Sequence, residues 1–239
     1  MIAETVIRVR RQSGEEMAVP LSEVGARHLI DARPWRTFRW YRGQRHLPGT
    51  YWSARMEAPV GYESRLELAN LILMDFDSDV LSIVSQPFLV EGWDGKRIRR
   101  HVPDYLLRLR DGGIRVIDVK PTHRLDVPKV RDSLGWTRRL MAVPGWEYEI
   151  CSEPDPTLST NVRFLSGFRW SDRFEEAEVE SARTAVNAPT TFASAVGQVS
   201  LALNNRARAR AVVLHLLWRR LLASDLTRTL DNDSEVIPV

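Results

Sequence analysis

The chain has 239 residues, 44% hydrophobic and 27% charged, as expected for a soluble globular protein with one good core and a small second domain. There is no run of about 18 uncharged apolar residues and no basic-then-apolar leader at Met1, so we expect no membrane span, no secretion signal and a cytoplasmic location. The single cysteine, Cys151, cannot form an internal disulfide and excludes a cysteine-built zinc site.

The 34 basic residues outnumber the 31 acidic ones only slightly, but they are unevenly placed. After a strand predicted over 5–10, a loop-rich stretch from Arg33 to Arg55 carries many arginines and aromatic residues and no acidic residue. Arginine interleaved with aromatic rings suits contact with phosphates and stacking on bases. The alternative is a packed aromatic arm surrounded by solvated arginines, and both can hold. We therefore predict an N-terminal segment and basic arm over residues 1–57.

A helix is predicted from Tyr62 to Phe76, because apolar residues recur there at three- and four-residue steps. Glu63 and Glu67 lie one turn apart on another side of this helix. Either glutamate could complete a metal site, and the alternative is two solvated surface side chains.

Short strands predicted over 80–84 and 88–90 are followed by a β-hairpin. Its arms are an apolar segment over 105–109 and a β-branched segment over 114–119, joined by turn chemistry at 111–113. These arms would bring Asp104 near Asp118. Because alternate strand residues share a face, Asp118 and Lys120 are expected to point the same way.

The hairpin predicts a metal-dependent nuclease centre. Asp104, Asp118 and the carbonyl of Val119 could give a divalent cation three oxygen ligands and leave positions for water and a phosphate oxygen. Lys120 could orient the attacking water or offset the charge that builds on phosphorus. The alternative is an ordinary hairpin with a charged outer face.

After the hairpin, a helix is predicted over 127–141, with Val130, Leu134 and Leu140 inward, and then a strand over 146–151. This strand should be parallel to the Asp118 strand, because a helix joins the two. We expect a nuclease core over 58–165. Two further helices, over 192–203 and 207–222, predict a mainly helical domain over 168–239, either a winged-helix module or a helical interaction domain.

Several short sequence segments together resemble those of one known family. They are found at residues 42–49, 62–68, 75–77, 85–88, 103–104, 118–121, 217–222 and 225–226. In these segments the chain resembles the TnsA-like endonuclease subunits of heteromeric transposases, within the restriction-endonuclease-like PD-(D/E)xK nucleases. The resemblance implies an α/β fold with a restriction-endonuclease-like core, in which helices flank a mixed sheet.

The resemblance also implies roles for individual residues. It places the family's helix glutamate on Glu67 rather than Glu63, the metal-binding aspartate on Asp104 and the lysine on Lys120. Some members carry glutamine where this chain has Asp118. The expected metal ligands are Glu67, Asp104, Asp118 and Val119, and the expected cofactor is Mg²⁺, with Mn²⁺ as a substitute.

Such subunits cut the 5′ strand of double-stranded DNA at transposon ends, beside a separate DDE-type transposase and an AAA+ ATPase regulator. The resemblance implies that residues 168–239 bind a partner, and that the protein is nucleoid-associated when on DNA. The alternatives are a stand-alone restriction or repair nuclease and a non-catalytic DNA-binding adaptor. The arginines that we expect to contact DNA are Arg36, Arg39, Arg42, Arg45, Arg55, Arg124 and Arg131.

Overall fold

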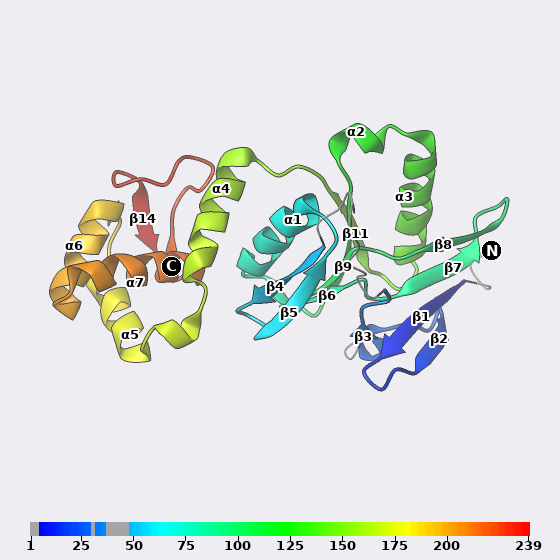
Figure 1. The fold of residues 1–239 in the computed structure, drawn as a ribbon, viewed down its shortest axis with the longest axis horizontal. Helices are drawn as coiled ribbons and strands as arrows, with labels where there is room; N and C mark the ends of the chain where they lie inside the picture. Colours follow the sequence, from blue (N-terminus) through cyan, green and yellow to red (C-terminus); the bar gives the residue numbers. More distant parts are fainter. Residues whose placement is uncertain (1–4, 30–31, 37–47) are drawn as a thin grey trace. The chain divides into compact units, whose positions relative to one another are not determined.

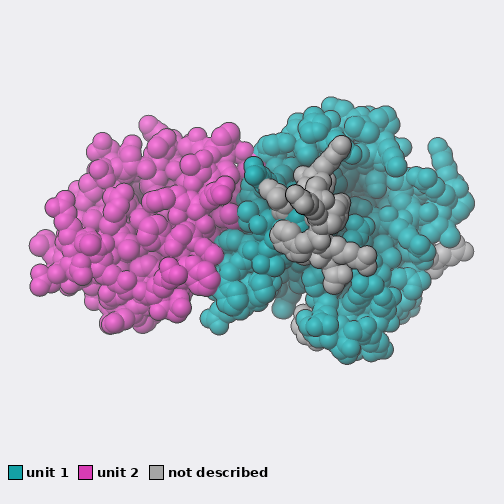
Figure 2. Space-filling view, in the orientation of Figure 1, with its two compact units in different colours: residues 1–71, 79–153 teal, residues 72–78, 154–239 magenta. Residues whose placement is uncertain are grey.

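The computed structural model describes residues 5–29, 32–36 and 48–239, and Figure 1 shows its ribbon. The chain divides into two compact units, residues 1–71 with 79–153 and residues 72–78 with 154–239, coloured separately in Figure 2. Strands and helices both contribute, so the predicted α/β class is confirmed. No helix in the described ranges is long and apolar enough to cross a membrane.

The first unit contains an antiparallel sheet in the order β2-β1-β7-β8, with β3 on β1. Its strands are β1 (Val6–Arg11), β2 (Glu16–Pro20), β3 (Ala32–Arg33), β7 (Leu89–Trp93) and β8 (Ile98–His101), and a short 3-10 helix, η1 (Ala26–His28), follows β2. The strand predicted over 5–10 is β1, which pairs with β7 with Ile7 opposite Val90. Ile7 therefore shares a core with Leu106 and Met141. The described residues of the predicted N-terminal segment over 1–57 therefore belong to the same compact unit as the hairpin.

The second sheet of this unit has the order β11-β10-β9-β6. Its strands are β6 (Val80–Ser85), β9 (Tyr105–Leu109), β10 (Ile114–Val119) and β11 (Glu147–Cys151). The predicted hairpin is confirmed as antiparallel β9 and β10, and β11 is parallel to β10 as expected. The crossover between β10 and β11 passes through α2 (Thr122–Leu125) and α3 (Pro128–Met141), and α3 buries Leu134, Trp136 and Leu140.

The stretch predicted as loop before the first long helix contains a two-stranded sheet instead. Its strands are β4 (Gly49–Ser53) and β5 (Ala58–Tyr62), in which Tyr51 lies opposite Val60. Tyr62 therefore ends a strand and does not start the helix, which is α1 (Arg65–Phe76). Tyr62 lies four residues before Leu66, and this spacing puts two residues on one face of a helix or on one face of a strand. The apolar periodicity therefore did not separate the two structures.

The second unit consists mainly of short helices around a three-stranded sheet in the order β12-β14-β13. Its elements are α4 (Pro156–Leu165), η2 (Ser166–Phe168), η3 (Ser171–Arg173), α5 (Glu176–Ala185), β12 (Thr190–Thr191), α6 (Phe192–Leu203), α7 (Arg206–Trp218), β13 (Leu222–Ala223) and β14 (Glu235–Pro238). The unit begins at Pro154, before the predicted boundary at 168. The reason is α4, whose Val162 and Leu165 are fully buried and whose Asn161 amide donates to the carbonyls of Leu226 and Arg228.

His215 on α7 is a buried titratable group in the core of the second unit. Its Nδ1 lies 2.7 Å from the carbonyl of Phe168, and its ring stacks on Phe174 with centroids 4.1 Å apart. Its Nε2 is buried and has no hydrogen-bond partner in the part of the chain that the structure describes. Burial therefore lowers the pKa of His215.

This environment predicts that His215 lowers the stability of the folded chain in acid. An unfolded chain takes up a proton at His215 near pH 6.5, whereas the folded chain does so only at lower pH, so this contribution to stability is lost as the pH falls below 6.5. We expect the urea midpoint of the parent to fall relative to that of His215→Gln between pH 7.5 and pH 5.0. A difference between the two midpoints that does not change with pH would show that His215 does not carry this dependence.

Candidate active site

The hairpin brings Asp104 and Asp118 to the same end of the second sheet. Tyr105 is opposite Ile117 in the β9–β10 register, and the Asp104 N–H donates to the Ile117 carbonyl at 3.0 Å. The Val119 N–H in turn donates to Asp104 Oδ2 at 2.6 Å. The backbone of β10 therefore fixes the carboxylate of Asp104 beside the strand that carries Asp118.

The ammonium group of Lys120 lies among the three oxygens that the sequence predicted as ligands. Its Nζ is 3.0 Å from Asp104 Oδ2, 2.9 Å from the Val119 carbonyl oxygen and 3.8 Å from Asp118 Oδ1. The expectation that Asp118 and Lys120 share a face is confirmed by the last distance. These oxygens thus converge on one positive charge.

Asp118 is fully buried, and two neighbours hold one of its oxygens. The Tyr148 hydroxyl donates to Oδ2, and His101 Nε2 lies 2.7 Å from the same atom. The other oxygen, Oδ1, is buried without a hydrogen-bond partner among the described residues. A buried carboxylate oxygen without a hydrogen bond is costly, and the charge of Lys120, 3.8 Å away, is its electrostatic partner.

The electrostatics keep Asp118 ionised. Burial alone would raise its pKa, but the hydrogen bond and charge of His101, with Lys120 and Tyr148, lower the pKa overall. The pKa of Asp104 is raised, first by burial and then by the charge of Asp118, against the opposing effect of Lys120. Lys120 has a raised pKa despite its burial, because Asp104 and Asp118 both favour the charged ammonium. An anion and a cation therefore lie side by side at this sheet end.

His101 and Tyr148 are two site residues that the sequence reasoning missed. Tyr148 lies on β11 opposite Val116, and Ile150 lies opposite Asp118, so strand parity puts Tyr148 on the Asp118 face. Because β11 was predicted from the sequence, this alternation could have placed Tyr148 at the site. His101 comes from the end of β8, and only its position three residues before Asp104 hinted at a role.

Glu67 caps α1 and also lies within electrostatic reach of Asp104. The Glu67 N–H donates to Ser64 Oγ at 3.1 Å, while Glu67 accepts from the Ser64 hydroxyl at 2.9 Å and from the Glu63 N–H at 2.7 Å. The pattern is close to a capping box, except that the Glu67 carboxylate accepts from the Glu63 N–H instead of the Ser64 N–H. Burial first, and the charge of Asp104 second, raise its pKa to about 7. Within the described ranges, no three His, Cys, Asp or Glu side chains gather into a group that could hold a metal, so Glu67 is not assembled with Asp104 and Asp118 into one site.

The raised pKa of Glu67 predicts a second pH dependence. The folded chain keeps this proton up to about pH 7, whereas the unfolded chain loses it near 4.5. Glu67 therefore lowers stability as the pH rises from 4.5 through 7. Thermal unfolding at several pH values should show that the midpoint of Glu67→Gln rises relative to that of the parent as the pH increases over this window. A difference between the two midpoints that stays constant with pH would contradict the assignment.

The arginines expected to contact DNA differ in whether the structure describes them. Arg39, Arg42 and Arg45 lie outside the described residues. The other four, Arg36, Arg55, Arg124 and Arg131, have exposed side chains. Exposure leaves these four accessible to a nucleic acid.

Comparison of the sequence with models of known protein families and with curated proteins finds no match. The chemistry of the site therefore decides what can be proposed. An ionised buried aspartate, a second carboxylate and a backbone carbonyl converge on a charged lysine. Such a set can bind a hard divalent cation and can stabilise negative charge on a phosphate.

Proposed function

We propose that this protein is a metal-dependent DNA endonuclease, the subunit of a heteromeric transposase that cuts the 5′ strand at transposon ends. One observation carries the nuclease part. The ionised, buried Asp118 has an oxygen without a hydrogen-bond partner among the described residues, beside Asp104, the Val119 carbonyl and Lys120. A purely structural hairpin has no need to bury a carboxylate in that state.

The residues present fit a divalent cation such as Mg²⁺ or Mn²⁺. Asp104, Asp118 and the Val119 carbonyl would hold it, and these hard oxygen donors are of the kind that both ions prefer. Two carboxylates would offset its two positive charges. When bound, the ion would lower the pKa of a water molecule and reduce the negative charge of the phosphate.

The protein's own groups would supply the remaining chemistry. Lys120 carries a positive charge at neutral pH and would donate to a phosphate oxygen or to the attacking water, which stabilises the charge developing at phosphorus. His101 and Tyr148 would keep Asp118 ionised and fix the orientation of its carboxylate. Asp104 is held by the Val119 N–H and so approaches the same point from the other arm of the hairpin.

The assignment to a TnsA-like subunit of the PD-(D/E)xK nucleases has separate support. The order α1, β6, β9, β10, α3, β11 is the order expected for a restriction-endonuclease-like core. In the second unit, the order α5, β12, α6, α7, β13, β14, with β14 between β12 and β13, fits the winged-helix module considered from the sequence. The sequence segments at 62–68 and 118–121, which carry part of the resemblance, lie at α1 and at β10 of this core. On this proposal the partners are a DDE-type transposase, an AAA+ ATPase and double-stranded DNA.

A plasmid-nicking assay tests the proposal and separates it from its competitors. Supercoiled plasmid carrying the element's ends is incubated with Mg²⁺ and the full chain, alone or with an integrase-like transposase and an AAA+ ATPase encoded by neighbouring genes. We expect nicks at the ends only with the partners present. Efficient cutting by the isolated chain would identify a stand-alone nuclease. Products that do not change when the chain is omitted would point to a non-catalytic adaptor.

A further inference from the structure

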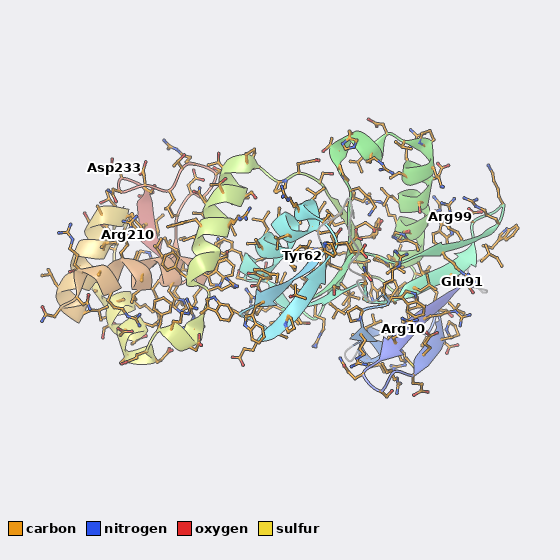
Figure 3. All side chains as sticks on the ribbon, viewed as in Figure 1. Arg10, Tyr62, Glu91, Arg99, Arg210 and Asp233 are labelled. Atoms are coloured by element: carbon orange, nitrogen blue, oxygen red, sulfur yellow. The ribbon has the colours of Figure 1, made fainter. Side chains whose placement is uncertain are left out.

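A basic pocket of about 370 Å³ lies in the first unit, outside the carboxylate pair. It opens between the turn that joins β7 to β8 and one face of α3. Figure 3 labels Arg99, which projects from β8 at this place. Its charged lining residues are Asp94, Lys96, Arg99, Arg131, Asp132 and Arg139. Four cations therefore face two carboxylates, which leaves an excess of two positive charges.

The positive charge is available to a ligand because most of it is not neutralised within the protein. Asp94 Oδ2 binds Arg99 at 2.8 Å, and Asp94 Oδ1 accepts the backbone N–H groups of Lys96 and Arg97. In the part of the chain that the structure describes, the side chains of Lys96, Arg131 and Arg139 form no ion pair. The pocket thus presents three uncommitted cations.

Two uncharged residues of α3 shape the space. The Trp136 ring forms one wall, with the Arg99 guanidinium 5.9 Å from its centroid. Gly135 leaves the floor open, since a Cβ placed there would meet only Arg139 Nη1, at 3.8 Å. Glycine inside a helix costs about 1 kcal/mol relative to alanine. Because Gly135 has no side chain, α3 leaves room for a ligand between the guanidinium groups above it.

The pocket and the catalytic carboxylates are connected through β8. Arg99 and His101 are alternate residues of this strand, so they share a face and lie roughly 7 Å apart along it. His101 in turn contacts Asp118 at 2.7 Å. This separation is comparable with the rise of about two nucleotides along one strand of duplex DNA. A strand held at Asp118 would carry its neighbouring phosphates towards the pocket.

We propose that the pocket binds a backbone phosphate of the DNA next to the bond that is cut. This inference rests on the proposed nuclease function and deepens it, because it names a part of the enzyme that positions the substrate. Arg131 and Arg139 clamp the phosphate, since guanidinium groups match its geometry in pairs. Lys96 adds a point charge from the β7–β8 turn.

Fluorescence anisotropy with a labelled duplex and the full chain tests the pocket, without divalent cations so that no strand is cut. In Arg131→Gln/Arg139→Gln we expect the dissociation constant to rise about tenfold and the slope of log K against log salt to fall by about 1 to 2 in magnitude. Arg108→Gln/Arg163→Gln removes the same charge from exposed positions outside the pocket and should change affinity less than twofold.

A second variant separates shape from charge. Gly135→Leu fills the pocket without altering any charge, and it should weaken binding of the duplex while leaving the thermal unfolding midpoint unchanged or higher. Unchanged binding in both Gly135→Leu and the double arginine variant would overturn the pocket assignment alone, provided that the parent binds the duplex. If the parent binds no duplex, the pocket and the proposed nuclease function both fall. Calorimetric binding of ATP that the double variant loses, with duplex affinity unchanged, would reassign the pocket to a free nucleotide.

Discussion

In a reaction reconstituted with its partners, the Lys120→Ala variant should cut transposon ends at least about 10²- to 10³-fold more slowly than the parent. Lys120 is the only charged donor that reaches both Asp104, at 3.0 Å, and Asp118, at 3.8 Å, among the described residues. On the proposed mechanism its ammonium would stabilise charge that develops only as the phosphate reacts. Asp104→Ala should be as severe, because it removes one of the two carboxylates of the site. The measurement is the initial rate of nicking on plasmid DNA.

Lys129→Ala is the matched control, since Lys129 is an exposed lysine of α3 and the variant loses the same charge. It should cut within twofold of the parent rate. Both Lys120→Ala and Asp104→Ala should remain folded, as judged by circular dichroism. Cleavage at the parent rate by either variant would remove the hairpin from the catalytic mechanism.

The Tyr148→Phe variant should lose about 1.5–3 kcal/mol of unfolding free energy, the range for a hydrogen bond to a charged group. The change removes only the hydroxyl that donates to Asp118 Oδ2, and the ring that packs under Arg138 remains. His101 is then the only described hydrogen-bond partner of a fully buried carboxylate. Denaturant unfolding of the two proteins measures the difference, and the variant should also cut more slowly.

Two comparisons isolate this effect. Tyr105→Phe removes a buried hydroxyl that donates to the neutral carbonyl of Gly61, and should cost only about 0.5–1.5 kcal/mol. In an Asp118→Asn background, Tyr148→Phe should cost less than it does in the parent, because the acceptor is no longer charged. Equal costs in both backgrounds would mean that Tyr148 does not stabilise the ionised form of Asp118.

The hairpin could be predicted from the sequence because its signals are local. The Asp111-Gly112-Gly113 turn and the β-branched residues of β10 fix its register, and the register fixes which side chains share a face. The parallel placement of β11 followed from the helix between the strands. The sequence therefore predicted that Asp104 lies near Asp118 and that Asp118 and Lys120 share a face.

Other parts depended on contacts that no local pattern records. The pairing of Ile7 with Val90 joins residues more than eighty positions apart in the chain, and it brings β1 into the core of the first unit. The assignment of residues from Pro154 onward to the second unit depends on Asn161 of α4, whose amide donates to the carbonyls of Leu226 and Arg228. His101 was missed for the same reason, because its contact with Asp118 is between separate sheets.

Calorimetric titration of the full chain with Mn²⁺ at pH 7.5 detects the proposed cation site whether or not partners are needed for cutting. We expect the parent to bind Mn²⁺, Asp104→Asn and Asp118→Asn to bind it at least about tenfold more weakly, and Glu147→Gln, a change at an exposed carboxylate on β11, to bind it like the parent. Equal binding in all four proteins, or none in the parent, would contradict a cation site at Asp104 and Asp118.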